Sequence, residues 1–594
     1  MPENKIKITP AKGRPMLHWV GKRPLDYVKG FPTQLIEVFD LLKAGRKVEI
    51  PAYDELKDNW QNLLFHGDNK DILATLLELG FRGKIDLIYI DPPFKSGADY
   101  VRKVELRGLK NLGQIDEDEA SILQQTMYFD IWNNDSYLQF MYERLLLLKE
   151  LLAETGTIYV HLDWHVSHYV KIIMDEVFGP GGENNEPGFR NEIIWCYTGP
   201  SGITRDFPRK HDVILRYSKS NEWTFNEILV PYKSGVHDTR GTALGYQGKK
   251  VNVKEFETKG KLIEDWWTDI WATERYRNEL LGFSTQKPPA LLERIIKASS
   301  NPGDLVLDCF IGSGTTAIAA QTLGRRWIGC DINKGAIHLT SRELQKIILQ
   351  QIKSIEFKYP FFSIYKVNNY DLQLLQTEAI ELAAEHIGIQ RTRTDPFFDG
   401  TLGESLVKII DFNHPLTLLD LQLIQDELKN RPGEDRDVTI VCLGKELAVD
   451  PWIEEWNVKH PVNKMKVIEL KTDKKYGSFL IHEPAVAKIK VERSGNKAVI
   501  EIQDFISPTI IKRLNIDSQL FKVKIPDFQA MIDFVLIDTN YDGSTFHIVY
   551  SDVPERKEDL VKGKYEVEVP EGSSKLAVKI VDMLGEEVLN VFEI

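Results

Sequence analysis

The sequence of 594 residues contains no stretch of about eighteen consecutive apolar residues, the length that a membrane-spanning helix needs. Its first residues also lack the apolar segment of a secretory signal peptide. The four cysteines, at positions 196, 309, 330 and 442, are too scattered for a zinc site or a disulfide framework. The net charge of −13 shows no overall excess of positive charge. These absences predict a cytoplasmic protein with no membrane partner and no bound metal, and the length of 594 residues predicts several domains.

One short segment joins a buried-strand pattern to two prolines. Apart from Asp86, residues 85–90 are apolar, with isoleucine at three positions, and they are followed by Asp91, Pro92, Pro93 and Phe94. Because proline has no N–H to donate, the predicted strand must end there, at the sheet edge where open α/β sheets bind ligands. The Asp91 carboxylate, the Pro92 carbonyl and the Phe94 ring suit a planar amine. An ordinary strand ending in a proline turn would show the same residues.

A second motif favours the ligand site over the ordinary turn. Residues 305–307 predict a short buried strand, and Gly312 and Gly314 allow a tight turn before a helix that begins at Thr315. Such a unit directs backbone N–H groups and a helix N-terminus toward a ligand. The two motifs together therefore predict a binding site.

An acid follows the next predicted strand. Residues 326–330 form this strand, and Asp331 after it is placed to accept hydrogen bonds from ribose hydroxyls. The same glycine turn and acid also fit the dinucleotide pattern of NAD-binding enzymes, with Ala317 as its third small residue. Asp308, in the strand before the turn, favours a cationic ligand over a pyrophosphate. The glycine segment alone leaves both classes of ligand open.

Together, the two motifs resemble those of the DNA amino methyltransferases, which use S-adenosyl-L-methionine. Their order, with the catalytic-type motif first, resembles the permuted beta group, which includes the modification subunits of Type III restriction systems. The resemblance covers roughly residues 10–350. It implies a doubly wound, mostly parallel Rossmann-like α/β sheet. It also implies methyl transfer to the exocyclic N6 of an adenine that is rotated out of double-stranded DNA.

The resemblance also implies roles for individual residues. The target base would meet the catalytic residues Asp91, Pro92, Pro93 and Phe94. Asp68 would lie near the adenine of the cofactor, and residues 285–289 would help to hold its methionine portion. The full cofactor-binding set is Asp68, Gln286, Lys287, Asp308, Phe310, Gly312, Gly314, Thr315, Thr316 and Asp331.

Basic residues gather between the two motifs, where the resembling family has its target-recognition insertion, here residues 198–284. They are interleaved with Tyr, Trp and Phe, a composition suited to reading base edges and contacting phosphates. A solvated loop region without a specific role would show a similar composition. The basic residues of the region include Arg205, Arg209, Lys210, Arg216, Lys219, Arg240, Lys249, Lys250, Lys254, Lys259 and Lys261.

Several alternatives have to be weighed against this interpretation. No cysteine follows a proline, so the thiol nucleophile of cytosine C5 methylation is missing. By resemblance, Asp rather than Ser at position 91 favours adenine N6 over cytosine N4, although either amine could use the same acceptors. An NAD-dependent oxidoreductase would explain the glycine turn but leave residues 91–94 unused. A non-catalytic DNA-reading subunit would explain the basic segment but make both motifs redundant.

Two further patterns suggest other chemistry. Residues 161–168 contain metal-type ligands, but the segment is predicted to cross from a strand to a helix, and its family counterpart binds no metal. Asp450 followed by Glu469 and Lys471 fits a nuclease pattern, but Glu-x-Lys is common on the solvent face of strands. We expect neither a metal site nor a nuclease.

The expected domain organisation has four parts: an N-terminal arm with a short helix (1–50), the methyltransferase core (51–354), a mixed α/β segment (355–459) and a β-rich C-terminal domain (460–594). The short helix is expected at residues 34–44. Residues 494–496 predict a hairpin turn between two strands. We expect the C-terminal domain to bind a helicase–nuclease restriction subunit or a second copy of the chain, as a homodimer would.

Overall fold

The computed structural model describes residues 5–11, 16–41, 48–93, 99–104, 106–107, 123–129, 134–182, 186–197, 205–230, 242–244, 250–252, 261–273, 286–354, 359–367, 380, 383–384, 387–392, 395, 397–410, 415–446, 448–470, 484–511, 527–556 and 558–594. The chain divides into two compact units. The first comprises residues 1–368 together with 485–594, and the second comprises residues 369–484.

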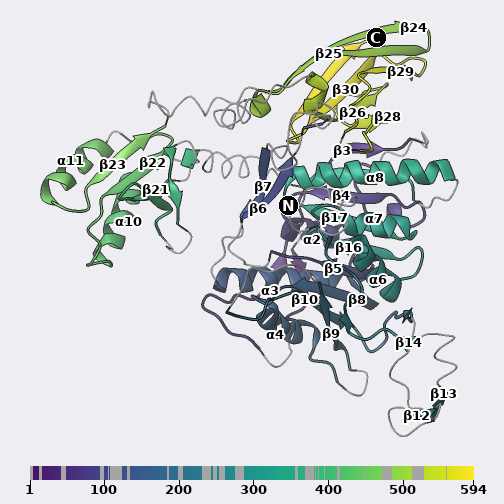
Figure 1. Cartoon of the computed structure of the whole chain (residues 1–594), viewed down its shortest axis with the longest axis horizontal. Helices are drawn as coiled ribbons and strands as arrows, with labels where there is room; N and C mark the ends of the chain where they lie inside the picture. The colour runs from purple at the N-terminus through teal and green to yellow at the C-terminus, as the bar shows by residue number, and fades with distance from the viewer. Residues whose placement is uncertain are drawn as a thin grey trace. The chain divides into compact units, whose positions relative to one another are not determined.

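A large sheet runs through the first unit and contains eleven strands in the described part of the chain (Figure 1). In spatial order they are β15 (Trp266–Trp267), β9 (Gly188–Cys196), β10 (His211–Ser218), β8 (Leu152–Leu162), β5 (Ile85–Ile90), β16 (Leu305–Asp308), β17 (Arg326–Asp331), β4 (Asn62–His66), β18 (Phe362–Val367), β3 (Thr33–Phe39) and β27 (Phe546–Ile548). The run from β8 to β18 is parallel throughout. β10 and β3 flank this run as antiparallel neighbours.

The two motif strands are neighbours in this sheet. Leu87 of β5 pairs with Val306 of β16, and Ile88 pairs with Leu307. These four side chains are buried, as the apolar runs in the sequence predict. Because the strands are parallel, their carboxyl ends reach the same edge of the sheet.

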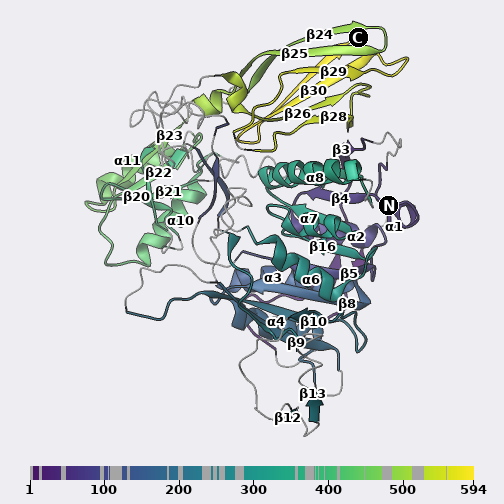
Figure 2. The same cartoon turned by 45° about the vertical axis from the view of Figure 1, so that its right-hand side comes forward.

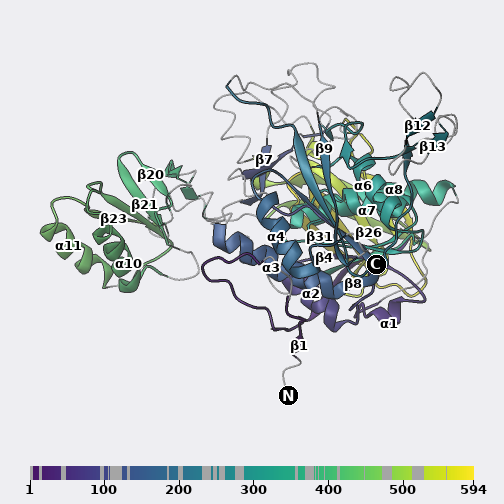
Figure 3. The ribbon, with the colours of Figure 1, turned by 90° about the horizontal axis from the view of Figure 1, so that it is seen from below.

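Helices cover both faces of the sheet (Figure 3). On β5, Ile88 and Ile90 pack into one hydrophobic cluster, while Leu87 and Tyr89 pack into another on the opposite face. The first cluster includes residues of α2 (Asn69–Glu78), α3 (Asn134–Leu151) and α4 (Ser167–Phe178). The second includes residues of α6 (Pro289–Ser299), α7 (Thr315–Thr322) and α8 (Lys334–Ser354). A short helix, α1 (Tyr53–Leu56), precedes β4. The expected doubly wound, mostly parallel α/β fold is confirmed.

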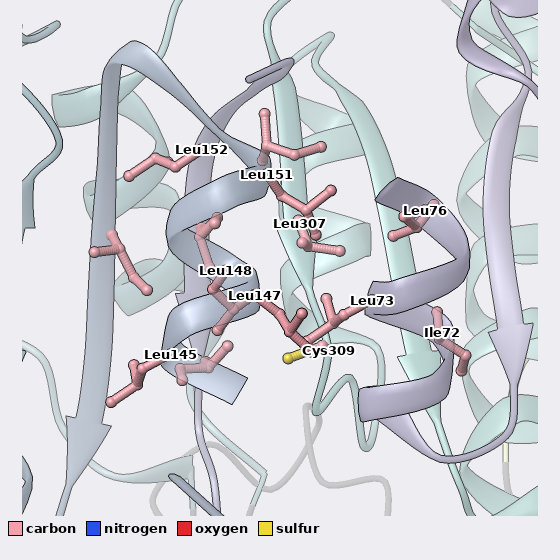
Figure 4. Packing of buried hydrophobic residues seen from close by; sticks show 14 of the residues in the cluster. Ile72, Leu73, Leu76, Leu145, Leu147, Leu148, Leu151, Leu152, Leu307 and Cys309 are labelled. Carbon is pink, nitrogen blue, oxygen red and sulfur yellow. The ribbon is translucent and has the colours of Figure 1, made fainter. Parts of the chain in front are cut away.

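Packing between α2 and α3 closes the first cluster (Figure 4). Leu73 of α2, Leu147 of α3 and Cys309 meet there and are almost completely buried. Each buried leucine of this kind stabilises the fold by about 1.5–3 kcal/mol. Burial also raises the pKa of the Cys309 thiol well above its usual range, so this cysteine is a packing residue and not a nucleophile.

The short helix expected at residues 34–44 is wrong, because residues 33–39 form the strand β3. Leu35, Val38 and Phe39 of this strand lie in the interior. β3 has partners on both sides, β18 and β27, and these distant pairings outweigh the local helical pattern.

The C-terminal strands belong to the same compact unit as the large sheet. They are β24 (Val486–Ser494), β25 (Lys497–Ile506), β26 (Ile532–Asp538), β28 (Tyr550–Asp552), β29 (Lys564–Glu568), β30 (Lys575–Asp582) and β31 (Glu587–Glu593), with a 3-10 turn at Phe528–Met531. β26, β28 and β30 lie beside β3 and α8 (Figure 2). The hairpin turn expected at 494–496 is confirmed, since Ser494 pairs with Lys497.

Charged groups connect the C-terminal strands to the sheet and to α8. Asp533 accepts hydrogen bonds from Arg342 of α8 and from Arg107, at 2.8 Å and 2.6 Å. Lys579 of β30 forms a buried ion pair with Glu37 of β3. β27 also adds a parallel edge strand to β3. These contacts make the C-terminal strands an integral part of the first unit.

The second unit contains a five-stranded sheet and two helices in its described residues. They are β19 (Gln390–Arg391), β20 (Gly400–Leu402), β21 (Ser405–Ile409), β22 (Val438–Cys442), β23 (Met465–Glu469), α10 (Leu418–Lys429) and α11 (Val449–Lys459). β23 pairs in parallel with β22. Residues 465–469, which the expected organisation assigned to the C-terminal domain (460–594), therefore belong to the second unit.

The remaining short strands form two-stranded pairs: β1 (Ile6–Lys7) with β2 (Tyr27–Val28), β6 (Asp99–Val104) with β7 (Leu123–Phe129), β11 (Leu229–Val230) with β14 (Lys261–Leu262), and β12 (Thr242–Leu244) with β13 (Lys250–Asn252). Within the described ranges, no helix is both long enough and apolar enough to cross a membrane.

Replacing Asp533 with Ala tests whether the C-terminal strands stabilise the core. The change leaves Arg107 and Arg342 buried without their shared carboxylate, which should lower the free energy of unfolding by about 3–5 kcal/mol. Urea unfolding followed by circular dichroism measures the difference. Glu566→Ala is the control, because its ion pair with Lys497 is exposed and should make no measurable contribution. Equal effects of the two changes would contradict the proposed coupling.

Candidate active site

A cavity of about 320 Å³ lies at the carboxyl ends of β4, β5, β16 and β17. Both motifs contribute to its wall, although they are far apart in the sequence. The expected site residues that line it are Asp68, Asp91, Pro93, Lys287, Asp308, Phe310, Gly312, Thr315, Thr316 and Asp331. The pairing of β5 with β16 brings the two segments together.

Asp91 is the central polar group on the β5 side of the cavity. Its Oδ2 accepts a hydrogen bond from Lys287 Nζ at 2.5 Å, and both side chains are largely buried. Its Oδ1 is buried and has no hydrogen-bond partner among the described residues. A buried acceptor without a partner costs free energy unless a ligand supplies the donor. Oδ1 is therefore available to an N–H group of a ligand.

The glycine turn forms another part of the cavity wall. Gly314 has a φ of +84°, and a Cβ atom there would lie 2.8 Å from the Thr340 hydroxyl, so the turn requires glycine. Asp308 accepts from Phe310 N at 2.9 Å and from Thr316 Oγ1 at 2.6 Å. Burial raises the pKa of Asp308 to about 7, which a cationic ligand would reverse.

Asp331 holds the other side of the same turn. It accepts from Gly312 N at 3.0 Å and from Asn333 N at 2.8 Å. Burial raises the pKa of Asp331 to about 6 in spite of these two hydrogen bonds. Asp331 thus holds the glycine turn in place and also lines the cavity.

Four expected site residues do not line the cavity or cannot be placed. Pro92 is buried, and Gly314 shapes the turn from behind. The backbone oxygen of Gln286 accepts from Thr273 Oγ1 at 2.8 Å. Phe94 lies outside the described residues, so its predicted stacking role stays a prediction.

Comparison with known proteins identifies the family. Residues 85–342 match the family model described as DNA methylase. The type II methyltransferase M.HpaI of Haemophilus parainfluenzae is 33% identical over 265 residues, which cover 44% of this chain and 68% of that protein. The chain belongs to the DNA methylase family. The expectation of a DNA methyltransferase is confirmed.

Two other relatives are informative. The DNA adenine methyltransferase YhdJ of Escherichia coli K12 is 28% identical over 298 residues, covering 48% of this methylase and 83% of the relative. The Mod subunit of the type III restriction-modification enzyme StyLTI of Salmonella typhimurium is 28% identical over 348 residues. In that case the match covers 46% of this methylase and 53% of the relative.

A buried arginine in the methylase cavity was missed at the sequence level. Arg144 of α3 contacts both Asp68 oxygens at 3.2 Å and the Asn69 Oδ1 at 2.5 Å. Its guanidinium lies 3.5 Å from the centre of the Phe140 ring, another cavity residue. Arg144 falls on the helical stripe that includes the buried Met141, and a charged residue on such a stripe was the available signal.

A second buried network lies behind Asp91. Tyr89 Oη lies 2.8 Å from His161 Nδ1, and His161 Nε2 lies 3.0 Å from Asp212 Oδ2. Tyr197 donates to the other Asp212 oxygen at 3.2 Å. The sequence suggested metal ligands in residues 161–168, but no cluster of three metal-type ligands occurs in the described part of the chain. His161 instead joins a network of hydrogen bonds.

The basic residues of the central segment fall into different groups. Arg216 is buried in β10. Lys219, which follows the last residue of β10, donates a hydrogen bond to the Leu152 carbonyl. Neither side chain is therefore available to DNA. Lys261 pairs with Glu264. Arg205, Arg209 and Lys210 lie just before β10, and both arginines are exposed. The side chains of Arg240, Lys249, Lys250, Lys254 and Lys259 lie outside the described residues.

The nuclease-like acids of the second unit surround a lysine. Lys445 pairs with Asp450 at 2.6 Å and lies 3.8 Å from Glu469. Lys471 lies outside the described residues. The two acids therefore form an ion-pair group in this unit.

The raised pKa of Asp308 predicts how stability depends on pH. Between about pH 4 and pH 7 the folded protein holds the Asp308 proton more tightly than the unfolded chain, so the free energy of unfolding falls as pH rises. For one group, the slope reaches at most about 1.4 kcal/mol per pH unit. Asp308→Asn removes this proton and should flatten the profile. Urea unfolding at several pH values measures both slopes, and identical profiles for the two proteins would contradict the prediction.

Proposed function

We propose that this methylase transfers a methyl group from S-adenosyl-L-methionine to the exocyclic N6 of adenine in double-stranded DNA. The observation that supports this most directly is the single cavity shared by Asp91 and the glycine turn. One wall offers an acceptor for an amine, and the other offers a cradle for a cationic nucleoside. We further propose that the chain is the modification component of a Type III-like restriction-modification system, acting in the cytoplasm.

The residues of the cavity fit the cofactor. Asp331 would accept hydrogen bonds from the ribose, and the rings of Phe140 and Phe310, whose centres are 6.0 Å apart, offer flat surfaces to an adenine. Asp308, which is buried, would be stabilised in its ionised form by the positive charge of the ligand. When bound, S-adenosyl-L-methionine supplies an electrophilic methyl group.

Asp91 performs the main task on the side of the base. Lys287 fixes Oδ2, so the carboxylate presents its unpartnered Oδ1 to the target amine. Accepting a hydrogen bond from the amine draws the nitrogen lone pair out of conjugation with the ring and makes the nitrogen a better nucleophile. Because acceptor and backbone turn are held rigidly before the reaction, their alignment supplies most of the acceleration. Pro93 lines the cavity next to this carboxylate.

Lys287 makes a contact that the resemblance did not imply. The sequence assigned it to the methionine portion of the cofactor, whereas its ammonium group contacts Asp91. We propose that Lys287 orients the catalytic carboxylate. A second contact with the cofactor would be compatible with that role, because an ammonium group has three donors.

Replacing Asp91 with Ala tests the catalytic assignment. Removing the carboxylate acceptor on the base side should lower methyl transfer by at least roughly 100-fold. Cofactor binding should remain measurable, since the glycine turn is intact. Transfer of labelled methyl groups to bacterial DNA and calorimetry with the cofactor measure the two quantities. Asp54→Ala is the control, an exposed acid of α1. Turnover by Asp91→Ala close to that of the control would refute the assignment.

Replacing Asp331 with Ala tests the ribose contact. Loss of a carboxylate acceptor should weaken cofactor binding by roughly 10- to 100-fold. Titration calorimetry gives the dissociation constant, and a thermal melt checks that the turn held by Asp331 still folds. Asp331→Asn serves as a second variant, because it preserves the size of the side chain. An unchanged dissociation constant in a folded variant would contradict the role.

The methylated base can be identified directly. Mass spectrometry of nucleosides from treated DNA should detect N6-methyladenine, whereas N4-methylcytosine would establish the cytosine alternative. Single-molecule sequencing of the product would add the recognition sequence. Co-purification with a helicase–nuclease subunit, and light scattering of the isolated chain, test the proposed restriction partner and the homodimer separately.

A further inference from the structure

Two exposed aromatic residues lie at the same sheet edge as the cavity. The Phe207 side chain is 94% exposed and the Trp164 side chain is 40% exposed. Trp164 follows the end of β8, and Phe207 lies four residues before β10 begins. An isolated exposed ring is ordinary, but rings grouped with cations at the edge of an active site suggest an interaction surface.

The Trp164 ring is held by two neighbours. The Arg209 guanidinium lies 4.2 Å from the centre of the ring, and the centre of the His165 ring lies 3.7 Å away on an inclined stack. Asp163 fixes His165 by accepting from its backbone N–H at 2.8 Å. The Trp164 ring is therefore held in place before any partner molecule binds, which lowers the entropic cost of binding.

Strand register places this group near Asp91. Val160 of β8 pairs with Ile90, the residue before Asp91, and Leu162 pairs with Val213 near the start of β10. β10 is two strands away from β5 (Figure 1). With a spacing of about 5 Å between neighbouring strands, the start of β10 lies about 10 Å along the edge from the catalytic strand.

The charge of residues 205–211 indicates which kind of molecule this surface binds. Residues 205–211 contain Arg205, Arg209 and Lys210 against a single acid, Asp206. This local excess contrasts with the net charge of −13 for the whole chain. A polyanion with flat rings matches both features, because arginines contact phosphates while aromatic side chains stack on bases. Duplex DNA has both.

We propose that Trp164, Arg205, Phe207 and Arg209, the Phe207 surface, hold the DNA duplex beside the cavity, with the Phe207 ring entering the base stack where the target base has left it. The inference rests on the proposed function, since it presupposes a base that is rotated out. Filling the gap with an apolar ring stabilises the rotated state, and the arginines fix the backbone on either side.

Binding to duplexes with and without an abasic site tests the role of Phe207. Fluorescence anisotropy without cofactor compares a labelled duplex of mixed sequence with the same duplex carrying one abasic site. The unmodified protein should prefer the abasic duplex, and Phe207→Ala should weaken that binding by roughly tenfold and abolish the preference. Tyr27→Ala is the matched control. Tyr27 is 56% exposed, but it lies away from the cavity. It pairs with Lys7, whose carbonyl accepts a hydrogen bond from Arg82 near the amino end of β5, whereas the cavity lies at the carboxyl end.

A salt titration tests the arginines independently of the ring. The double variant Arg205→Gln/Arg209→Gln should reduce the slope of log affinity against log salt by about two units while keeping the preference for the abasic duplex. Phe207→Ala should leave that slope unchanged. The two variants thus separate phosphate contacts from entry into the base stack.

The outcomes distinguish this inference from the proposed function. If Phe207→Ala binds both duplexes as the unmodified protein does while the unmodified protein methylates DNA, the inference is overturned and the function stands. If the unmodified protein binds no duplex and methylates no DNA, the proposed function fails and the inference with it. A concentration-dependent oligomer that Phe207→Ala dissociates would identify a second copy of the chain as the partner and overturn the inference.

Discussion

Parallel pairing of β5 with β16 is the constraint on which the site depends. Each strand is a short buried apolar run that ends in, or is followed by, an acid, and neighbouring parallel strands end at the same edge. Asp91 and Asp308 therefore face one cavity, although most of the core separates them in the sequence. A register shift by one residue would turn the strand that precedes Asp91 over and separate the two walls.

The cavity concentrates acids, and the surrounding structure compensates each of them differently. Lys287 pairs with one carboxylate and Arg144 with another, both inside the protein. Asp308 and Asp331 accept hydrogen bonds from backbone N–H groups, and Asp308 also accepts one from the Thr316 hydroxyl. Burial raises the pKa of this second pair, so the pocket favours a ligand that brings positive charge. The four acids are Asp68, Asp91, Asp308 and Asp331.

The C-terminal strands extend the core instead of forming a separate body. β27 continues the large sheet, and Asp533 joins α8 to Arg107, a residue of the segment that follows the catalytic motif.

Charge is unevenly distributed along the chain. A strongly acidic total coexists with a basic, aromatic edge at Phe207, because binding depends on the local field and not on the sum.

Residues 85–94 and 304–316 by themselves determined two buried strands, the turns that end them and most of the residues that line the cavity, since prolines, glycines and buried apolar runs act locally. The fold class followed from the family resemblance that these residues carry. Local pattern failed at residues 33–39, which became a strand through pairing with β18 and β27. Only the tertiary structure decided that Lys287 orients toward Asp91, that Arg144 enters the cavity and that Phe207 remains exposed. Contacts between residues distant in sequence depend on strand order and helix packing, and those follow from the folded chain as a whole.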